Sequence, residues 1–185
     1  KRGLLAEAGE CVDLFLEDNP THRRALLLSA EILEKLHDSD QARKRFTTLF
    51  SMSNISAKTY RAYAGFLLRQ GERVKAAAVL DRATEAHPSC ADIQTLRAIV
   101  LQMLDRHQQC ILDLTKFMKA YPSPPEMNWL LGKSWYAQRN YGSALASFQK
   151  ARLDGAASTI GPDAPEFKCL MAEAYSLHHL GRTVE

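Results

Sequence analysis

The sequence lacks any apolar run of about 18 residues, so no segment is expected to cross a membrane. No signal-peptide pattern is visible either. Cysteine is scarce: Cys11, Cys90, Cys110 and Cys169 are far apart and form no CxxC pair, so neither a zinc site nor a dithiol redox motif is expected. Cys110 falls at a small repeat position, where a free thiol behaves as a small apolar side chain.

Neither sign of charge dominates the sequence. It has 24 Lys and Arg residues against 21 Asp and Glu, a net charge of +3, which does not predict nucleic-acid binding. Hydrophobic residues make up 46% of the 185 residues, enough for a substantial core and one or two domains.

Motifs of catalytic and phosphate-binding sites are also missing, including HExxH, GxSxG and glycine-rich phosphate loops. The adjacent pair His178 and His179 would point about 100° apart on a helix, a poor geometry for holding one metal ion. Nothing in the sequence places Glu126 and Glu173 together as paired acids. We therefore expect no enzymatic activity, no metal site and no cofactor.

What the sequence does contain is a period of 34 residues, which separates Pro20, Asn54, Pro88, Pro122 and Ala156. Small residues recur at the eighth and twentieth positions of each unit: Ala30, Ala64, Ala98 and Gly132, then Ala42, Ala76, Cys110 and Ala144. Large apolar residues recur at the eleventh and twenty-fourth: Leu33, Leu67, Leu101 and Trp135, then Phe46, Leu80, Leu114 and Phe148. This pattern is typical of closely crossing helices around a filled core, and no strand-like alternation is present.

The pattern resembles the tetratricopeptide repeat (TPR), which has this length. The match is strongest in LGKSWYAQRNYGSALASFQKA, at Leu131–Ala151, and next in Ala57–Cys90. The resemblance implies an all-α fold: a right-handed superhelical solenoid of antiparallel helix pairs with about ten helices.

A single array over residues 1–185 is expected. Its full repeats would be 23–56, 57–90, 91–124 and 125–156, after a truncated repeat whose second helix is residues 1–20. Residues 157–165 contain Gly-Pro and Ala-Pro and predict an inserted loop. Residues 166–181 would be the first helix of a further repeat. Each end leaves a helix without its mate, so we expect the chain to be part of a longer array.

The turn inside each repeat departs from the usual glycine. Gly71 holds this place in one unit, but His37, Asp105 and Arg139 hold it in the others. These turns would be more strained if they need a left-handed residue. Phe117 replaces the small residue that closes the second helix of its unit, so local packing is expected to differ.

In TPR proteins the concave groove comes mainly from the first helix of each repeat. On those helices Lys58, Arg61 and Arg69 would form a basic strip. The groove would also carry an aromatic patch and further apolar side chains, namely Trp129, Lys133 and Tyr136, then Ile99, Met103 and Tyr175. Two alternatives remain open: Trp129 could pack into the neighbouring repeat, and the strip could be merely solvated.

The resemblance favours a non-enzymatic scaffold that binds another protein, through an acidic and apolar segment or helix, in the groove. Alternatives are a structural arm of a larger assembly, as in bacterial secretion, pilus or envelope biogenesis, and substrate-recognition repeats of an enzyme whose catalytic domain lies elsewhere. RNA binding is disfavoured by the charge. The places of the family's chaperone carboxylate clamp hold Leu27, Glu31, Arg61 and Gly65 without asparagine, so that clamp is not expected. A cytoplasmic location is favoured over a periplasmic one, and no oligomeric state is predicted.

Overall fold

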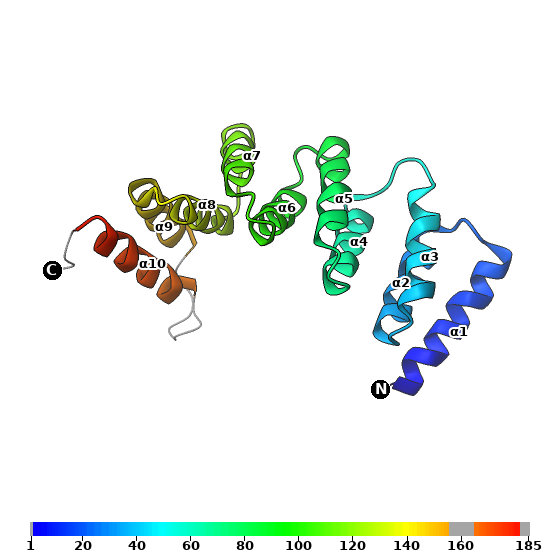
Figure 1. Cartoon of the computed structure of the whole chain (residues 1–185). Coiled ribbons are helices and arrows are strands. Elements are labelled where there is room, and N and C mark those ends of the chain that lie inside the picture. The colour runs from blue at the N-terminus through cyan, green and yellow to red at the C-terminus, as the bar shows by residue number, and fades with distance from the viewer. Residues whose placement is uncertain (1, 156–164, 182–185) are drawn as a thin grey trace. The chain divides into compact units, whose positions relative to one another are not determined.

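A computed structural model describes residues 2–155 and 165–181, and within these ranges it contains ten α-helices and no strand (Figure 1). The predicted all-α fold is confirmed. The helices are α1 (Arg2–Asp18), α2 (Arg23–Lys35), α3 (Ser39–Phe50), α4 (Ala57–Arg69), α5 (Arg73–Ala86), α6 (Ala91–Met103), α7 (His107–Ala120), α8 (Pro125–Ala137), α9 (Tyr141–Gly155) and α10 (Pro165–His179). The predicted loop over 157–165 lies outside the described residues except for Pro165, at which α10 begins.

The chain forms two compact units, Lys1–Val79 and Leu80–Glu185, and α5 spans the boundary between them. In the first unit α2 packs against α1, α3 and α4. Its core contains fully buried side chains on three helices, among them Leu26, Phe46 and Phe66. Aromatic rings fill the space between α3 and α4: the ring of Phe46 stacks on Tyr63 with centroids 5.0 Å apart and packs at a tilt against Phe66 at 5.3 Å.

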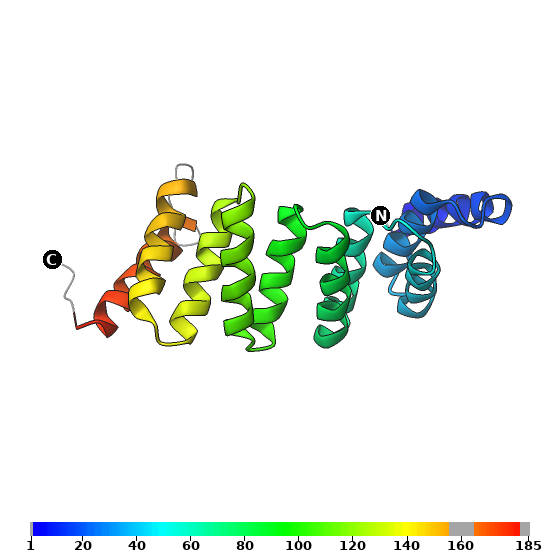
Figure 2. The same ribbon diagram turned by 90° about the horizontal axis from the view of Figure 1, so that it is seen from above.

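In the second unit α6 packs against α7, α7 against α8, α8 against α9, and α9 against α10, so helices that follow one another in the chain lie side by side (Figure 2). A core cluster joins α6, α7 and α8: Ala98, Leu101, Cys110, Leu114, Phe117, Met127 and Leu130. Phe117, where the sequence predicts altered packing, is buried, and its ring packs at a tilt against Tyr121 with centroids 5.1 Å apart. The extra ring thus fills space beside the following helix instead of being exposed.

The turns within the repeats all use a left-handed residue. His37, Asp105 and Arg139 have φ of 67°, 57° and 58°, and Gly71 has φ of 77°. In each turn the next N–H donates to the carbonyl at the eleventh repeat position, for example Asp38 N–H to Leu33 O at 2.9 Å. This six-residue closure ends the first helix and reverses the chain. Three of the four turns therefore place a non-glycine residue in a left-handed backbone conformation that glycine would adopt with less strain.

Two polar bridges occupy equivalent places one in each unit. In the first unit Asp13 Oδ1 on α1 accepts hydrogen bonds from Ser29 Oγ at 3.1 Å and from Arg45 Nη2 at 2.9 Å. Asp81, Arg97 and Asp113 stand 68 residues after Asp13, Ser29 and Arg45. The buried Arg97 on α6 donates a hydrogen bond to Asp81 at 2.8 Å and also pairs with Asp113. These are the Asp13 and Asp81 bridges, and each joins three successive helices.

The charge on Arg97 is maintained inside its bridge. Burial alone would lower the pKa of this guanidinium, but its hydrogen bonds with Asp81 and Asp113 outweigh burial and raise the pKa. Removing either helix partner would leave a poorly hydrated cation, which is costly.

Candidate functional site

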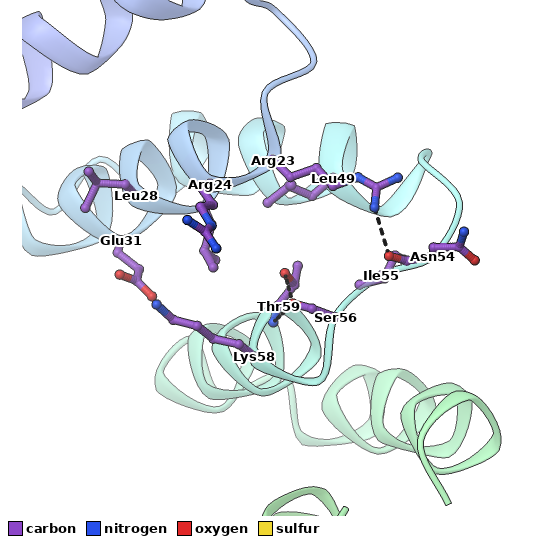
Figure 3. Close-up of a pocket in the computed structure, with 11 residues that line it drawn as sticks. Arg23, Arg24, Leu28, Glu31, Leu49, Asn54, Ile55, Ser56, Lys58 and Thr59 are labelled. Atoms are coloured by element: carbon purple, nitrogen blue, oxygen red, sulfur yellow. Dashed lines mark hydrogen bonds between the residues drawn. The ribbon is translucent and has the colours of Figure 1, made fainter.

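The first unit has a cavity of about 680 Å³ between α2 and α4, here called the α2–α4 recess (Figure 3). Its floor is apolar, formed by Leu27, Leu49 and Ile55. Its rim is charged: Arg24 and Lys58, each the second residue of its helix, point into the space between the two helices. The recess therefore combines an apolar floor with a cationic edge, a composition suited to an amphipathic ligand.

Hydrogen bonds hold the wall of this recess in place. Arg23 Nη1 donates to Asn54 O at 3.0 Å and Arg23 Nη2 to Ser53 O at 2.7 Å, which ties the loop before α4 to the start of α2. Ser56 Oγ caps α4 by accepting from Thr59 N–H at 3.2 Å. These bonds pre-organise the recess, because the loop that carries Ile55 is fixed at both ends.

The predicted basic strip does not have three equivalent cations. Lys58 is exposed at the recess, whereas Arg69 pairs with Glu34 of α2 and donates a second hydrogen bond to it from Nη2 at 2.7 Å. The hydrogen bond with Glu34 raises the pKa of Arg69. Arg61 is exposed on α4. Glu34 therefore offsets the positive charge of Arg69 at the end of α4.

In the second unit, apolar side chains are exposed on the first helices of the repeats. Ile99 and Met103 of α6 are 38% and 40% exposed, and Tyr175 of α10 is 55% exposed. Gln102, between the first two, donates from Nε2 to Leu130 O at 2.6 Å and joins α6 to α8. These exposed side chains, together with Lys133 and Tyr136 of α8, are here called the first-helix face of the second unit.

Trp129 and Tyr136 differ in surroundings. Trp129 is half-buried and packs against Phe148 of its own helix pair, with ring centroids 5.0 Å apart. Lys133 is exposed one turn further along α8. Tyr136 is half-buried, and its ring centroid lies 5.3 Å from that of Tyr141 and 5.7 Å from that of His179. The three predicted patch residues therefore lie on one helix, and only Lys133 is largely solvent-facing.

Comparison with known families accounts for this architecture. One tetratricopeptide repeat model matches residues 38–100 and another matches residues 112–165, and together they span more than half of the chain. The chain belongs to the tetratricopeptide repeat family. No curated protein matches the TPR chain by sequence.

Solved structures of TPR proteins share its fold. YrrB, described as a TPR protein with an unusual peptide-binding site, has a TM-score of 0.72 and 15% identity over 92% of this chain and 84% of its own. PilW, described as a type IV pilus biogenesis factor, has a TM-score of 0.71 and 20% identity over 96% and 79%. Pseudomonas aeruginosa pilF has a TM-score of 0.72 and 16% identity over 97% and 78%. The predicted TPR solenoid class is thus confirmed.

No three His, Cys, Asp or Glu side chains of residues 2–155 and 165–181 are grouped to hold a metal ion. None of the described helices has the length and apolar character needed to cross a membrane. Cys110 is buried, which raises the pKa of its thiol, and it packs as a small core side chain. Only Cys11 is an exposed thiol among the cysteines whose side chains are described.

Sequence reasoning named Lys58 as a groove residue, but it did not identify the α2–α4 recess as a cavity, nor the Tyr141–His179 stack, in which the ring centroids lie 4.5 Å apart. A signal for the recess does exist in the sequence: Arg24 and Lys58 stand at the same position of successive repeats, 34 residues apart. The stack joins α9 to α10 across residues that no repeat period relates, so the sequence alone offers no pointer to it.

Proposed function

We propose that this TPR protein is a non-enzymatic scaffold that binds an extended or helical segment of another protein along the concave groove. The observation that carries the proposal is the exposure of Ile99, Met103 and Tyr175 on the first helices of the second unit. Contiguous apolar surface on a folded domain is typical of interfaces, where its burial contributes affinity.

The chemistry of this face suggests how such a segment would be held. The apolar side chains of Ile99, Met103 and Tyr175 would be buried against the partner, and each aromatic anchor contributes about 2 kcal/mol or more at an interface hot spot. Lys133 would favour a partner with acidic residues and speed its association. Peptide binding described for YrrB is consistent with this use of the fold.

A second candidate is a structural arm that docks through its second helices. Leu112 of α7 and Leu153 of α9 are 60% and 77% exposed, and both lie on second helices of their repeats. PilW, with the same fold, is described as a pilus biogenesis factor, which is a role in assembly. A protein docking on this side would bury Leu112 and Leu153 and leave the first-helix face open.

Site-specific photo-crosslinking separates the two functions. The photoreactive residue p-benzoylphenylalanine would be placed at Met103 or Tyr175 on the first helices, and at Leu112 or Leu153 on the second helices, in cells that express the protein. Concave binding predicts adducts from Met103 and Tyr175, and not from Leu112 or Leu153. The reverse pattern would support the structural arm and reject groove binding.

The partner identified in this way would then be titrated against purified variants. Tyr175→Ala is expected to weaken binding about 30-fold, which corresponds to about 2 kcal/mol. Trp129→Ala and Arg61→Glu test the other predicted groove residues. Unchanged affinity in all three variants would reject the concave-groove model even if the partner is genuine.

A further inference from the structure

The α2–α4 recess has two cations that the fold itself does not use. Arg23 is engaged with the loop carbonyl groups of Ser53 and Asn54. Arg24 and Lys58, by contrast, form no ion pair with any residue in the part of the chain that the structure describes. Both side chains are exposed and point into the opening (Figure 3). A carboxylate placed between them would meet two positive charges.

The N-terminal ends of α2 and α4, which lie beside the recess, are not the main source of its attraction for a carboxylate. His22 Nδ1 already accepts from Ala25 N–H at 3.2 Å at the start of α2, and Ser56 caps α4. The backbone N–H groups of both first turns are thus partly satisfied. Anion recognition in the recess therefore depends on the Arg24 and Lys58 side chains.

The apolar part of the recess has room for a side chain. Leu27 and Leu49 form a floor that is almost fully buried, whereas Ile55 is half-buried at the wall. Leu28, also on the lining, is 47% exposed. A ligand side chain placed here would remove further apolar surface from water, at about 25 cal/mol per Å².

The surface continues beyond the recess. A second cavity of about 310 Å³ lies on the other side of Arg24 and Leu28, which line both cavities, and it includes Val12 and Phe15. Phe15 is 45% exposed. Two adjacent cavities that share a ridge suit a stretch of polypeptide with successive side chains better than one small molecule.

One residue restricts which segment fits. Glu31 lies on the recess lining, and its carboxylate faces the Lys58 ammonium across the mouth (Figure 3). A single ligand carboxylate near Arg24 and Lys58 is therefore favoured, while a second one toward Glu31 would be repelled.

We propose that the α2–α4 recess binds an extended segment of a partner protein in which an apolar residue adjoins a single Asp or Glu. The apolar side chain rests on Leu27 and Ile55, and the carboxylate pairs with Arg24 and Lys58. This inference rests on the proposed scaffold function, and it specifies the chemistry of the segment that the first unit takes.

The test begins with a phage-displayed library of random peptides selected on the full chain. The selected peptides are expected to share an apolar residue next to Asp or Glu. Their synthetic forms, with amidated C-termini, would be titrated by fluorescence anisotropy against the wild type and against Arg24→Glu and Lys58→Glu. Each variant is expected to weaken binding about tenfold or more, and added salt is expected to weaken wild-type binding.

Lys44→Glu is the matched control, because Lys44 is an exposed lysine of the same unit that lies on α3 and does not line the recess. It makes the same change in charge and is expected to leave the dissociation constant unchanged. Glu31→Gln is expected to strengthen binding, since it removes a negative charge beside the ligand. Far-ultraviolet circular dichroism would verify that each variant is folded.

Several results would overturn the proposal. Peptides without an acidic residue, or peptides that bind Arg24→Glu and Lys58→Glu as tightly as wild type, would exclude the recess. If their binding instead depends on Ile99 or Tyr175, the scaffold function stands and only the recess fails. Peptides that bind only with a free C-terminus would assign the cations to a terminal carboxylate. Selection of no peptide at all would reject both the recess and peptide binding by this chain.

Discussion

Gly132 provides a sharp test of the packing between α8 and α9. A Cβ atom added at this position would lie 2.5 Å from Cε1 and 2.6 Å from Cδ1 of Phe148. The Phe148 ring cannot easily withdraw, since it is 2% exposed and packs against Trp129 with centroids 5.0 Å apart. Gly132→Ala should therefore force side chains or backbone to shift, although alanine is the better helix former.

The size of the effect follows from two opposing terms. Overpacking of a filled core costs about 1–3 kcal/mol, and exchange of glycine for alanine inside a helix returns about 1 kcal/mol. We expect Gly132→Ala to lower the free energy of unfolding by up to about 2 kcal/mol. Gly142→Ala is the matched control: Gly142 lies in α9 with nothing within 4 Å of its added Cβ, so a gain of about 0.5 kcal/mol is expected.

Urea denaturation followed by tryptophan fluorescence measures this directly. The two tryptophans of the chain, Trp129 and Trp135, both lie on α8, so the signal reports on the second unit. Phe148→Leu should cost less stability in the Gly132→Ala background than in the wild type, because the smaller side chain relieves the contact. A Gly132→Ala protein as stable as Gly142→Ala, or costs that simply add, would refute the reasoning.

Three further predictions concern the turns and the charges. Arg139→Gly should raise the free energy of unfolding by about 0.5–1 kcal/mol in the same assay, since it relieves a left-handed φ of 58°, whereas Arg139→Ala should not raise it. Arg97→Met should lower the free energy of unfolding by about 1–2 kcal/mol, because the partly exposed carboxylates of Asp81 and Asp113 lose their shared cation. A stability equal to that of the wild type would count against this prediction. Hydrogen bonds from Lys75 and, to a smaller extent, Arg43 lower the pKa of Glu72 in the folded protein. The Glu72 carboxylate therefore stabilises the fold above the unfolded-state pKa of about 4.3, and this stabilisation is lost as pH falls through the folded-state pKa. Glu72→Gln should therefore be less stable than wild type near neutral pH, and the difference should shrink progressively as pH falls below the unfolded-state pKa. A difference in stability that does not change with pH would contradict this role.

The repeat period made much of the fold predictable. It places small residues at helix crossings and large ones in the core, and the buried Ala30, Ala98 and Phe46 follow that rule. The left-handed turns were also within reach, because a six-residue closure needs a positive φ whichever residue stands there, as at His37 and Arg139. Such features repeat because they depend on neighbours at a constant separation in the chain.

The candidate site was less predictable, since its chemistry depends on pairs that the period does not relate. Arg69 is a free cation in any helical-wheel projection, and its partner Glu34 comes from the preceding repeat on another helix. Trp129 shares a helix face with Lys133 and Tyr136, but its contact with Phe148 depends on the glycine beneath the ring. Whether Arg69 and Trp129 are available to a ligand depends on where their side chains point and which residues they contact, and residue spacing alone does not reveal either.

The Asp81 bridge implies that removing or reordering repeats of this protein would carry an electrostatic cost. Arg97 is the seventh residue of its repeat and draws one carboxylate, Asp81, from the repeat before it. The equivalent of Asp81 one repeat earlier is Thr47. Deletion of residues 57–90 would preserve the period and every small and large apolar position, but it would set the Arg97 cation against a hydroxyl. Removal of a repeat from this chain is therefore constrained by the charges between successive repeats as well as by shape.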